Sequence, residues 1–158
     1  MNLDEKIINA LKDLDYKEAT EIQKKAIPIA LKKRDILAAA QSGTGKTAAF
    51  LLPILTELLA NKQVDKPILR ALILVPTREL ATQISKAVSD FSKYMEVESL
   101  AMVGGVSTKD QEKKIAKGID ILVATSGRLM EHLKNGTVDL SSVTTVVIDE
   151  VDTMLDMG

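Results

Sequence analysis

A glycine-rich segment near the start of the chain has the residue types of a phosphate-binding loop. Residues 40–47 are Ala-Gln-Ser-Gly-Thr-Gly-Lys-Thr, and apolar runs lie on both sides of them. Glycines let the backbone curl so that successive N–H groups point at one anion, and a following helix adds the positive end of its dipole. Lys46 is expected to reach the outer phosphates, and the Thr47 hydroxyl to ligate magnesium. The segment therefore predicts binding of a nucleoside triphosphate.

An acidic pair near the other end of the chain is the second chemical signal. The apolar run at residues 146–148 leads directly into Asp149 and Glu150. Asp149 is expected to hold magnesium through water, and Glu150 to polarise the attacking water for phosphoryl transfer. The predicted catalytic residues are therefore Lys46, Asp149 and Glu150, and the predicted metal ligands are Thr47 and Asp149.

Three further loops carry groups that bind oxyanions, namely hydroxyls, bare glycine amides and arginines. Each loop by itself is most simply an ordinary helix cap or a flexible turn. Together they could follow a row of backbone phosphates without contacting bases. Their residues are Thr77 and Arg78, then Gly104 and Gly105, then Thr125, Gly127 and Arg128.

The hydrophobic pattern predicts alternating strands and helices that place these loops together. Apolar runs predict strands at residues 35–40, 70–75, 97–103, 119–124 and 145–148. Helical patterns occupy residues 3–14, 21–32, 46–61, 78–94, 109–117 and 126–134. This alternation is typical of an α/β fold with a parallel sheet covered by helices on both faces. Right-handed crossovers bring the carboxyl ends of the strands to one edge, and each of the chemical loops directly follows a predicted strand.

Composition limits the remaining possibilities. The chain has 158 residues, a net charge of −1, 46% hydrophobic residues and no cysteine. One soluble globular domain without disulfides or thiolate metal sites is expected, with a cytoplasmic location and no association with membranes. Near-neutral charge argues against a strongly basic nucleic-acid binder, and few aromatic residues argue against sequence-specific recognition of single strands.

The set of motifs resembles the N-terminal RecA-like domain of DEAD-box RNA helicases. The resemblance covers the phosphate loop, residues 76–80, 104–105 and 125–128, and the Asp-Glu-Val-Asp segment at residues 149–152. Tyr16, Thr20 and Gln23 are similar to the adenine-recognition motif of that family. Two departures are Val151, where the family name has Ala, and Ser126, where the family usually has Pro.

The resemblance implies ATP and Mg²⁺ as cofactors and the sugar-phosphate backbone of RNA as partner. Gln23 would hydrogen-bond the adenine, and Asp152 would couple the nucleotide state to interdomain contacts. The RNA-binding residues would be those of the three oxyanion-binding loops. The nucleotide-binding residues would be Tyr16, Thr20, Gln23, Gln41, Ser42, Gly43, Thr44, Gly45, Lys46 and Thr47.

The same resemblance predicts an incomplete domain over residues 1–158, because the family's next motif and second RecA-like domain are absent. A strand would then be missing between the phosphate-loop strand and the acidic-motif strand. We expect such a chain to bind ATP weakly, not to unwind duplexes, and to self-associate through exposed apolar sheet surface.

Two other functions remain open from the sequence alone. One is a nucleic-acid or partner-binding module that retains the fold but not catalysis. The other is a phosphate-loop ATPase unrelated to RNA, which the three additional anion-binding loops disfavour. His132, the only histidine, is expected to be an ordinary helix residue and not a ligand or base.

Overall fold

The computed structural model describes residues 3–41, 43–61 and 65–156. The chain divides into two compact units, Met1–Lys62 with Ala87–Glu96, and Gln63–Lys86 with Val97–Gly158. Within the described ranges, no helix is long and apolar enough to cross a membrane. Ser42, one of the predicted nucleotide-binding residues, lies outside these ranges.

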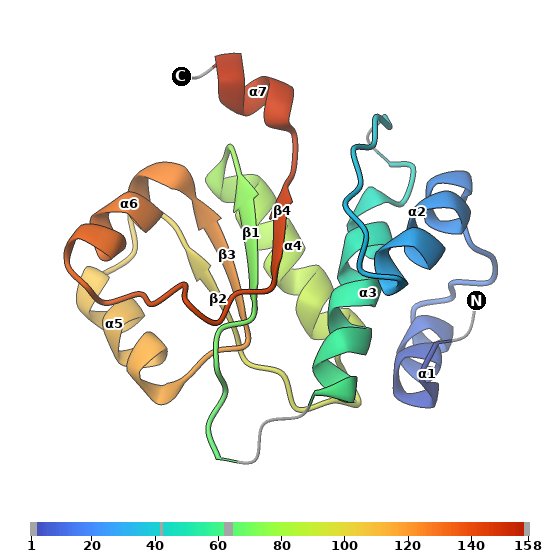
Figure 1. The fold of residues 1–158 in the computed structure, drawn as a ribbon, viewed down its shortest axis with the longest axis horizontal. Helices are drawn as coiled ribbons and strands as arrows, with labels where there is room; N and C mark the ends of the chain where they lie inside the picture. Colours follow the sequence, from blue (N-terminus) through green and yellow to red (C-terminus); the bar gives the residue numbers. More distant parts are fainter. Residues whose placement is uncertain (1–2, 42, 62–64, 157–158) are drawn as a thin grey trace. The chain divides into compact units, whose positions relative to one another are not determined.

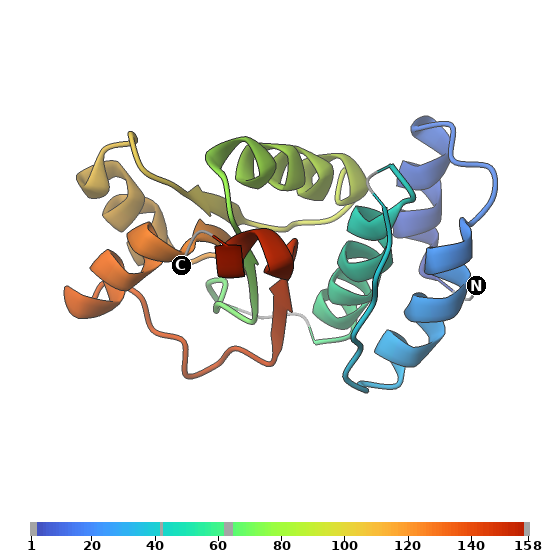
Figure 2. The ribbon, with the colours of Figure 1, turned by 90° about the horizontal axis from the view of Figure 1, so that it is seen from above.

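The first unit is helical. It contains α1 (Glu5–Asp13), α2 (Glu21–Leu31), α3 (Lys46–Ala60) and the C-terminal part of α4 (Arg78–Phe91). Asp4 caps α1 by accepting a hydrogen bond from the Lys6 N–H at 2.9 Å, which satisfies one of the free amides of the first turn. In Figures 1 and 2, α2 lies along α3, and α1 also contacts α3. The buried side chains of this unit include Ile7, Ile27, Leu51 and Leu55.

The second unit is built around a parallel four-stranded sheet. Its strands are β1 (Ala71–Val75), β2 (Ser99–Met102), β3 (Ile121–Thr125) and β4 (Thr145–Ile148), in the spatial order β2-β3-β1-β4. Leu72 of β1 lies opposite Leu122 on one side and Val146 on the other. In a parallel sheet both faces of a strand are buried, so its side chains are mostly apolar. Residues 121–124 of β3 show this pattern.

Three helices belong wholly to the second unit, α5 (Thr108–Lys117), α6 (Ser126–Lys134) and the short α7 (Val151–Asp156). Helix α5 contacts β2 and α6 contacts β3, and the two helices lie side by side (Figures 1 and 2). Leu129 of α6 packs with Leu72, Leu100 and Leu122 in one apolar cluster. The predicted α/β class with a parallel sheet is therefore confirmed.

The strand predicted at residues 35–40 is wrong. This segment forms no strand, and its side chains are exposed, with Leu37 at 96% and Ile36 at 42%. An apolar pattern does not make a strand by itself, because the backbone N–H and C=O groups need a neighbouring strand to pair with. The other four strands occur where the pattern predicts them, with ends shifted by at most two residues.

Candidate functional site

The predicted phosphate loop is held in a curled conformation by two glycines. Gly43 and Gly45 have φ values of 80° and 88°, in the left-handed region that residues with a side chain rarely adopt. The Thr44 hydroxyl donates a 2.6 Å hydrogen bond to the Gln41 carbonyl, which closes the turn. Gly45 is the N-cap of α3, so Lys46 and Thr47 are the first residues of a 15-residue helix. This geometry suits an anion, because the backbone curl and the positive end of the helix dipole occur together.

Gln23 supports this loop from α2. Its side chain is only 3% exposed, and its Nε2 donates a 3.1 Å hydrogen bond to the Gly45 carbonyl. Its Oε1 accepts from the Thr20 N–H at 3.0 Å. A primary amide has two hydrogens and two lone pairs, so one of each is still available for an adenine edge. The structure thus brings Gln23, Thr20 and Gly45 together, and adenine recognition stays a prediction.

Tyr16 lies in the same unit but is used for packing. Its ring meets that of Phe91 edge-to-face, with centroids 5.8 Å apart and planes at 76°. This arrangement is a favourable one for two aromatic rings. Tyr16 is also 46% exposed, so the packing leaves part of the residue accessible. Its contact with a nucleotide stays a prediction.

In the second unit, four predicted loops occur at one edge of the sheet. The strands are parallel, so residues after Val75, Met102, Thr125 and Ile148 all follow carboxyl ends on the same side. Ligands bind at this edge in open α/β sheets. The predicted convergence of the three oxyanion-binding loops and the acidic segment is therefore present.

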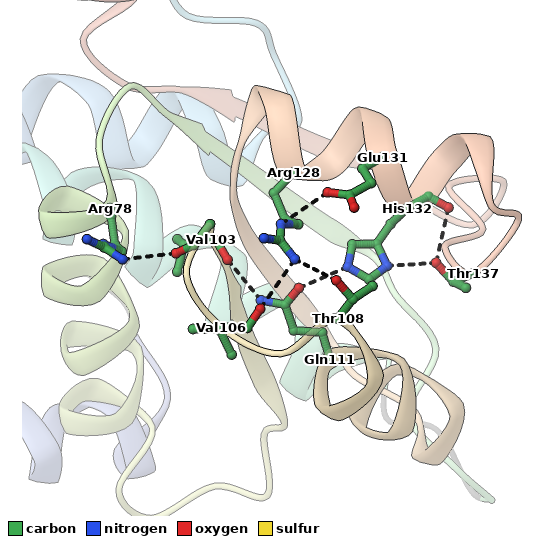
Figure 3. Close-up of polar contacts among 10 residues, drawn as sticks. Arg78, Val103, Val106, Thr108, Gln111, Arg128, Glu131, His132 and Thr137 are labelled. Atoms are coloured by element: carbon green, nitrogen blue, oxygen red, sulfur yellow. Dashed lines mark hydrogen bonds and ion pairs between the residues drawn. The ribbon is translucent and has the colours of Figure 1, made fainter.

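Arg78 contacts the loop between β2 and α5, residues 103–107, which we call the double-glycine loop. Its Nη1 donates a 3.1 Å hydrogen bond to the Gly104 carbonyl (Figure 3). Gly105 has φ 83°, and a Cβ atom there would lie 2.4 Å from the Arg78 guanidinium. The positive φ favours glycine at this position, and a larger residue would also push the end of the Arg78 side chain aside.

Arg128 holds the same loop from α6. Its Nη1 donates to the Thr108 hydroxyl at 2.8 Å and to the Val106 carbonyl at 3.3 Å, and its Nε pairs with Glu131 at 3.3 Å (Figure 3). The side chain is only 15% exposed. A guanidinium has five N–H donors, so these contacts leave capacity for phosphate. The sequence predicts that both arginines bind RNA. The structure shows that both also donate hydrogen bonds to carbonyls of the double-glycine loop.

Thr77 and Thr125, which precede α4 and α6, differ in whether the hydroxyl caps the helix. Thr77 accepts a hydrogen bond from the Leu80 N–H at 3.2 Å and so caps α4. Thr125 precedes α6 and makes no capping hydrogen bond with its side chain. A Cβ atom added at Gly127 would meet no described atom within 4 Å, so the turn after β3 is open on that side.

The acidic segment follows β4. The Asp149 N–H donates to the Leu74 carbonyl at 3.0 Å, which extends the pairing with β1 to the first acidic residue. Glu150 has φ 53°, a left-handed conformation that costs a non-glycine residue of order 1 kcal/mol or more, and such residues cluster at functional sites. Asp152 is exposed in the first turn of α7.

The donor chemistry of Thr47 and Asp149 suits magnesium. Among the described residues, no group of three or more His, Asp or Glu side chains could hold a metal by itself. Magnesium in nucleotide sites keeps several waters and takes one or two protein ligands plus phosphate oxygens. A threonine hydroxyl and a carboxylate fit that chemistry.

Known proteins resemble this chain over its whole length. The family model for the DEAD/DEAH box helicase matches residues 20–158. The chain belongs to the DEAD/DEAH box helicase family. Its relatives include the ATP-dependent RNA helicase DeaD of Escherichia coli, 46% identical over 96% of this chain and 24% of that protein. Another is the ATP-dependent RNA helicase SrmB of the same species, 43% identical over 100% of this chain and 36% of that protein.

A solved structure supports the same family. The crystal structure of a hypothetical ATP-dependent RNA helicase from Sulfolobus tokodaii superposes with a TM-score of 0.88 at 38% identity, covering 99% of this chain and 44% of that one. The fold of this DEAD/DEAH box helicase chain is therefore RecA-like. The chain spans only about a fifth to a third of the length of the curated relatives, with 20% for a probable ATP-dependent RNA helicase of Dictyostelium discoideum.

Gln111 was not singled out from the sequence, and His132 was expected to be an ordinary helix residue. Gln111 and His132 are buried and hydrogen-bonded to each other beside the double-glycine loop (Figure 3). The expectation that His132 is neither a ligand nor a base is not tested by these contacts. A polar residue on the buried face of a predicted helix is the sequence signal that could have found Gln111.

Proposed function

We propose that this chain is the ATP-binding domain of an ATP-dependent RNA helicase, which couples ATP hydrolysis to local unwinding of RNA or remodelling of RNA–protein complexes. The observation that carries the proposal is the joint presence of two features. One is a curled, glycine-based anion loop at the start of α3, and the other is a sheet edge where three oxyanion-binding loops and an acidic segment converge. A phosphate-loop ATPase unrelated to RNA has no need of the three oxyanion-binding loops.

In this proposal, the amides of the phosphate loop and Lys46 bind the phosphates of ATP, and Gln23 selects adenine. When bound, magnesium neutralises phosphate charge, with Thr47 and Asp149 as its protein ligands. Glu150 orients the attacking water. Asp152 transmits the nucleotide state to a second RecA-like domain.

RNA is bound through its backbone. Arg78, Arg128, Thr125 and the amides of Gly104 and Gly105 offer charged or polar donors without an aromatic platform for bases. Such contacts bind phosphate irrespective of sequence and weaken as salt increases. The chain by itself is proposed to bind nucleotide and RNA weakly and to lack unwinding activity. Its proposed location is the cytoplasm.

Calorimetry with Mg-ATP and fluorescence anisotropy with a labelled single-stranded RNA test the two halves separately. Lys46→Ala should abolish nucleotide binding, and Arg78→Ala with Arg128→Ala should weaken RNA binding at low salt. Lys24→Ala, an exposed lysine on α2, is the charge-matched control for both assays. Unchanged RNA affinity in the double arginine variant would remove the RNA assignment, and unchanged nucleotide affinity in Lys46→Ala would remove the ATP assignment.

A further inference from the structure

A buried chain of hydrogen bonds runs from α6 to the double-glycine loop. His132 is 0% exposed and Gln111 is 1% exposed. The Nε2 atom of His132 lies 2.9 Å from Gln111 Oε1, and Gln111 Nε2 donates a 3.1 Å bond to the Val103 carbonyl (Figure 3). Because a buried polar group without a partner costs free energy, each member holds the next in place.

Donor and acceptor roles along this chain are fixed by chemistry. Only the NH₂ end of an amide can donate to the Val103 carbonyl, so the oxygen of Gln111 must face His132. His132 Nε2 must then carry a hydrogen. The Thr137 hydroxyl, 2.8 Å from Nδ1 and 3.1 Å from the His132 carbonyl, completes the environment of the ring. The direction of donation is therefore from His132 through Gln111 to Val103.

Three helices hold the loop through its carbonyls. Gln111 of α5 binds the Val103 carbonyl, Arg78 of α4 binds that of Gly104, and Arg128 of α6 binds that of Val106. In a trans peptide, the C=O of one residue and the N–H of the next point in opposite directions. Holding the Val103 and Gly104 carbonyls toward the protein therefore turns the N–H groups of Gly104 and Gly105 away from it.

The exposure of these glycines agrees with that orientation. Gly104 and Gly105 are both exposed, and within the described part of the chain no acceptor hydrogen-bonds to their N–H groups. Two adjacent exposed amides, on a loop that two guanidinium groups also contact, can donate hydrogen bonds to phosphate oxygens.

We propose that Gln111 and His132 are positioning residues for RNA, which aim the Gly104 and Gly105 amides at a backbone phosphate without touching it. The inference rests on the proposed function and deepens it. His132 sets the position of Gln111, and Gln111 sets the peptide plane between Val103 and Gly104. The loop contact with RNA thus depends on a histidine that is completely buried.

The test measures RNA affinity in two variants that break the chain at different points. His132→Phe keeps a planar ring but removes the donor to Gln111, and Gln111→Leu removes both of the Gln111 bonds. Each should weaken binding of a labelled single-stranded RNA by about tenfold, the equivalent of one hydrogen bond to a charged group. The salt dependence should change little, because both arginines remain and a neutral amide contact releases no counterion. His132→Gln, whose side-chain amide can still donate a hydrogen bond to Gln111, should keep the RNA affinity of the unsubstituted protein.

Val138→Ala is the control for a purely structural effect. Val138 belongs to the apolar cluster of the same unit and follows Thr137, but it takes no part in the hydrogen-bond chain. All variants are compared well below their unfolding temperatures. Val138→Ala should lose stability but keep its RNA affinity, whereas RNA affinity should fall in His132→Phe and Gln111→Leu.

The outcomes separate this inference from the function on which it rests. If the unsubstituted protein binds RNA, and folded His132→Phe and Gln111→Leu bind it with the same affinity, the positioning role is overturned. The proposed function is then left intact. No RNA binding by the unsubstituted protein at low salt would overturn both. If neither variant folds, the amide NMR signals of Gly104 and Gly105 in the unsubstituted protein decide the matter. They must shift when RNA is added, and their failure to shift overturns the inference.

Discussion

The side-chain amide of Gln23 donates a hydrogen bond to the carbonyl of Gly45, across 22 positions of sequence. This contact joins the predicted adenine-binding residue to the last glycine of the phosphate loop. A Cβ atom at Gly45 would lie 2.4 Å from Gln23 Nε2 and 2.8 Å from Thr20 Oγ1. The shape of the anion loop therefore depends on a buried glutamine in another helix as well as on its own glycines.

Gly45→Ala should consequently damage the loop more than Gly43→Ala. Both positions have positive φ, and a left-handed alanine costs roughly 1–2 kcal/mol. A Cβ atom at Gly43 meets no described atom within 4 Å, whereas at Gly45 it displaces the Gln23 amide. We expect Mg-ATP affinity to fall by about tenfold more in Gly45→Ala than in Gly43→Ala, equal to about 1.4 kcal/mol. Calorimetry on both folded variants measures this, and equal losses would contradict the role of Gln23.

Removing one partner of the ion pair between Arg70 and Asp120 should strongly destabilise the sheet unit. Arg70 Nη2 lies 3.2 Å from Asp120 Oδ1, with side chains only 12% and 8% exposed. Asp120 Oδ2 also accepts from the Glu98 N–H at 2.9 Å. Asp120→Ala leaves a buried cation and a backbone amide without this acceptor, so we expect a loss of about 3 kcal/mol in the free energy of unfolding.

Urea unfolding of Asp120→Ala measures this loss. Lys17→Ala is the matched control, since Lys17 pairs with Asp15 at 3.7 Å where both side chains are at least 80% exposed. Its cost should stay below about 1 kcal/mol. A loss in Asp120→Ala no larger than that of Lys17→Ala would show that the buried pair is not a major source of stability.

Asp13 gives the helical unit a defined pH dependence. Its hydrogen bond with Lys93, at 2.8 Å, and a second one from the Tyr94 hydroxyl lower the pKa of Asp13 below its ordinary value of 3.8. The Asp13 hydrogen bond likewise raises the pKa of Lys93 above 10.5. A lowered acid pKa stabilises the folded state above the unfolded value, and that stability is lost as the pH falls through the folded pKa. The raised lysine pKa stabilises below 10.5 and is lost as the pH rises through its folded value.

Asp13→Asn should therefore be less stable than the unsubstituted protein at neutral pH, with a difference that shrinks below about pH 4. Thermal unfolding at a series of pH values measures the difference. In a Lys93→Met background, which removes the main cause of the shift, the pH-dependent part of the difference should be smaller. A difference that stays constant from neutral pH to about pH 3 would be incompatible with the lowered Asp13 pKa.

The apolar face of β4 should promote self-association. Within the described residues β4 pairs only with β1, and Val146 and Ile148 are 56% and 51% exposed. An open strand edge with exposed apolar side chains is a template for a second copy of the chain. Val146→Lys should raise the monomer fraction in sedimentation velocity at increasing protein concentration. Met130→Lys, which adds the same charge at an exposed position on α6, should not, and a single monomer species in the unsubstituted protein would contradict the prediction.

Local sequence patterns determined the types and order of most elements. Strand β4 and helix α6 begin and end at the predicted residues, because an apolar run and a helical period are properties of neighbouring residues. The three oxyanion-binding loops and the acidic segment followed from the same logic, since parallel strands place residues such as Gly104 and Asp149 at one edge whatever the details of packing. Family membership was likewise determined by motifs and their order along the chain.

Only the tertiary structure decided which polar groups meet. The pairing of Gln23 with Gly45, the two arginines on the double-glycine loop and the buried contact of His132 with Gln111 each join residues that are far apart in sequence. Hydrogen-bond partners are set by distance and direction in space, which no local period encodes. For the same reason residues 35–40, apolar enough for a strand, remain outside the sheet: a strand exists only where another backbone lies beside it.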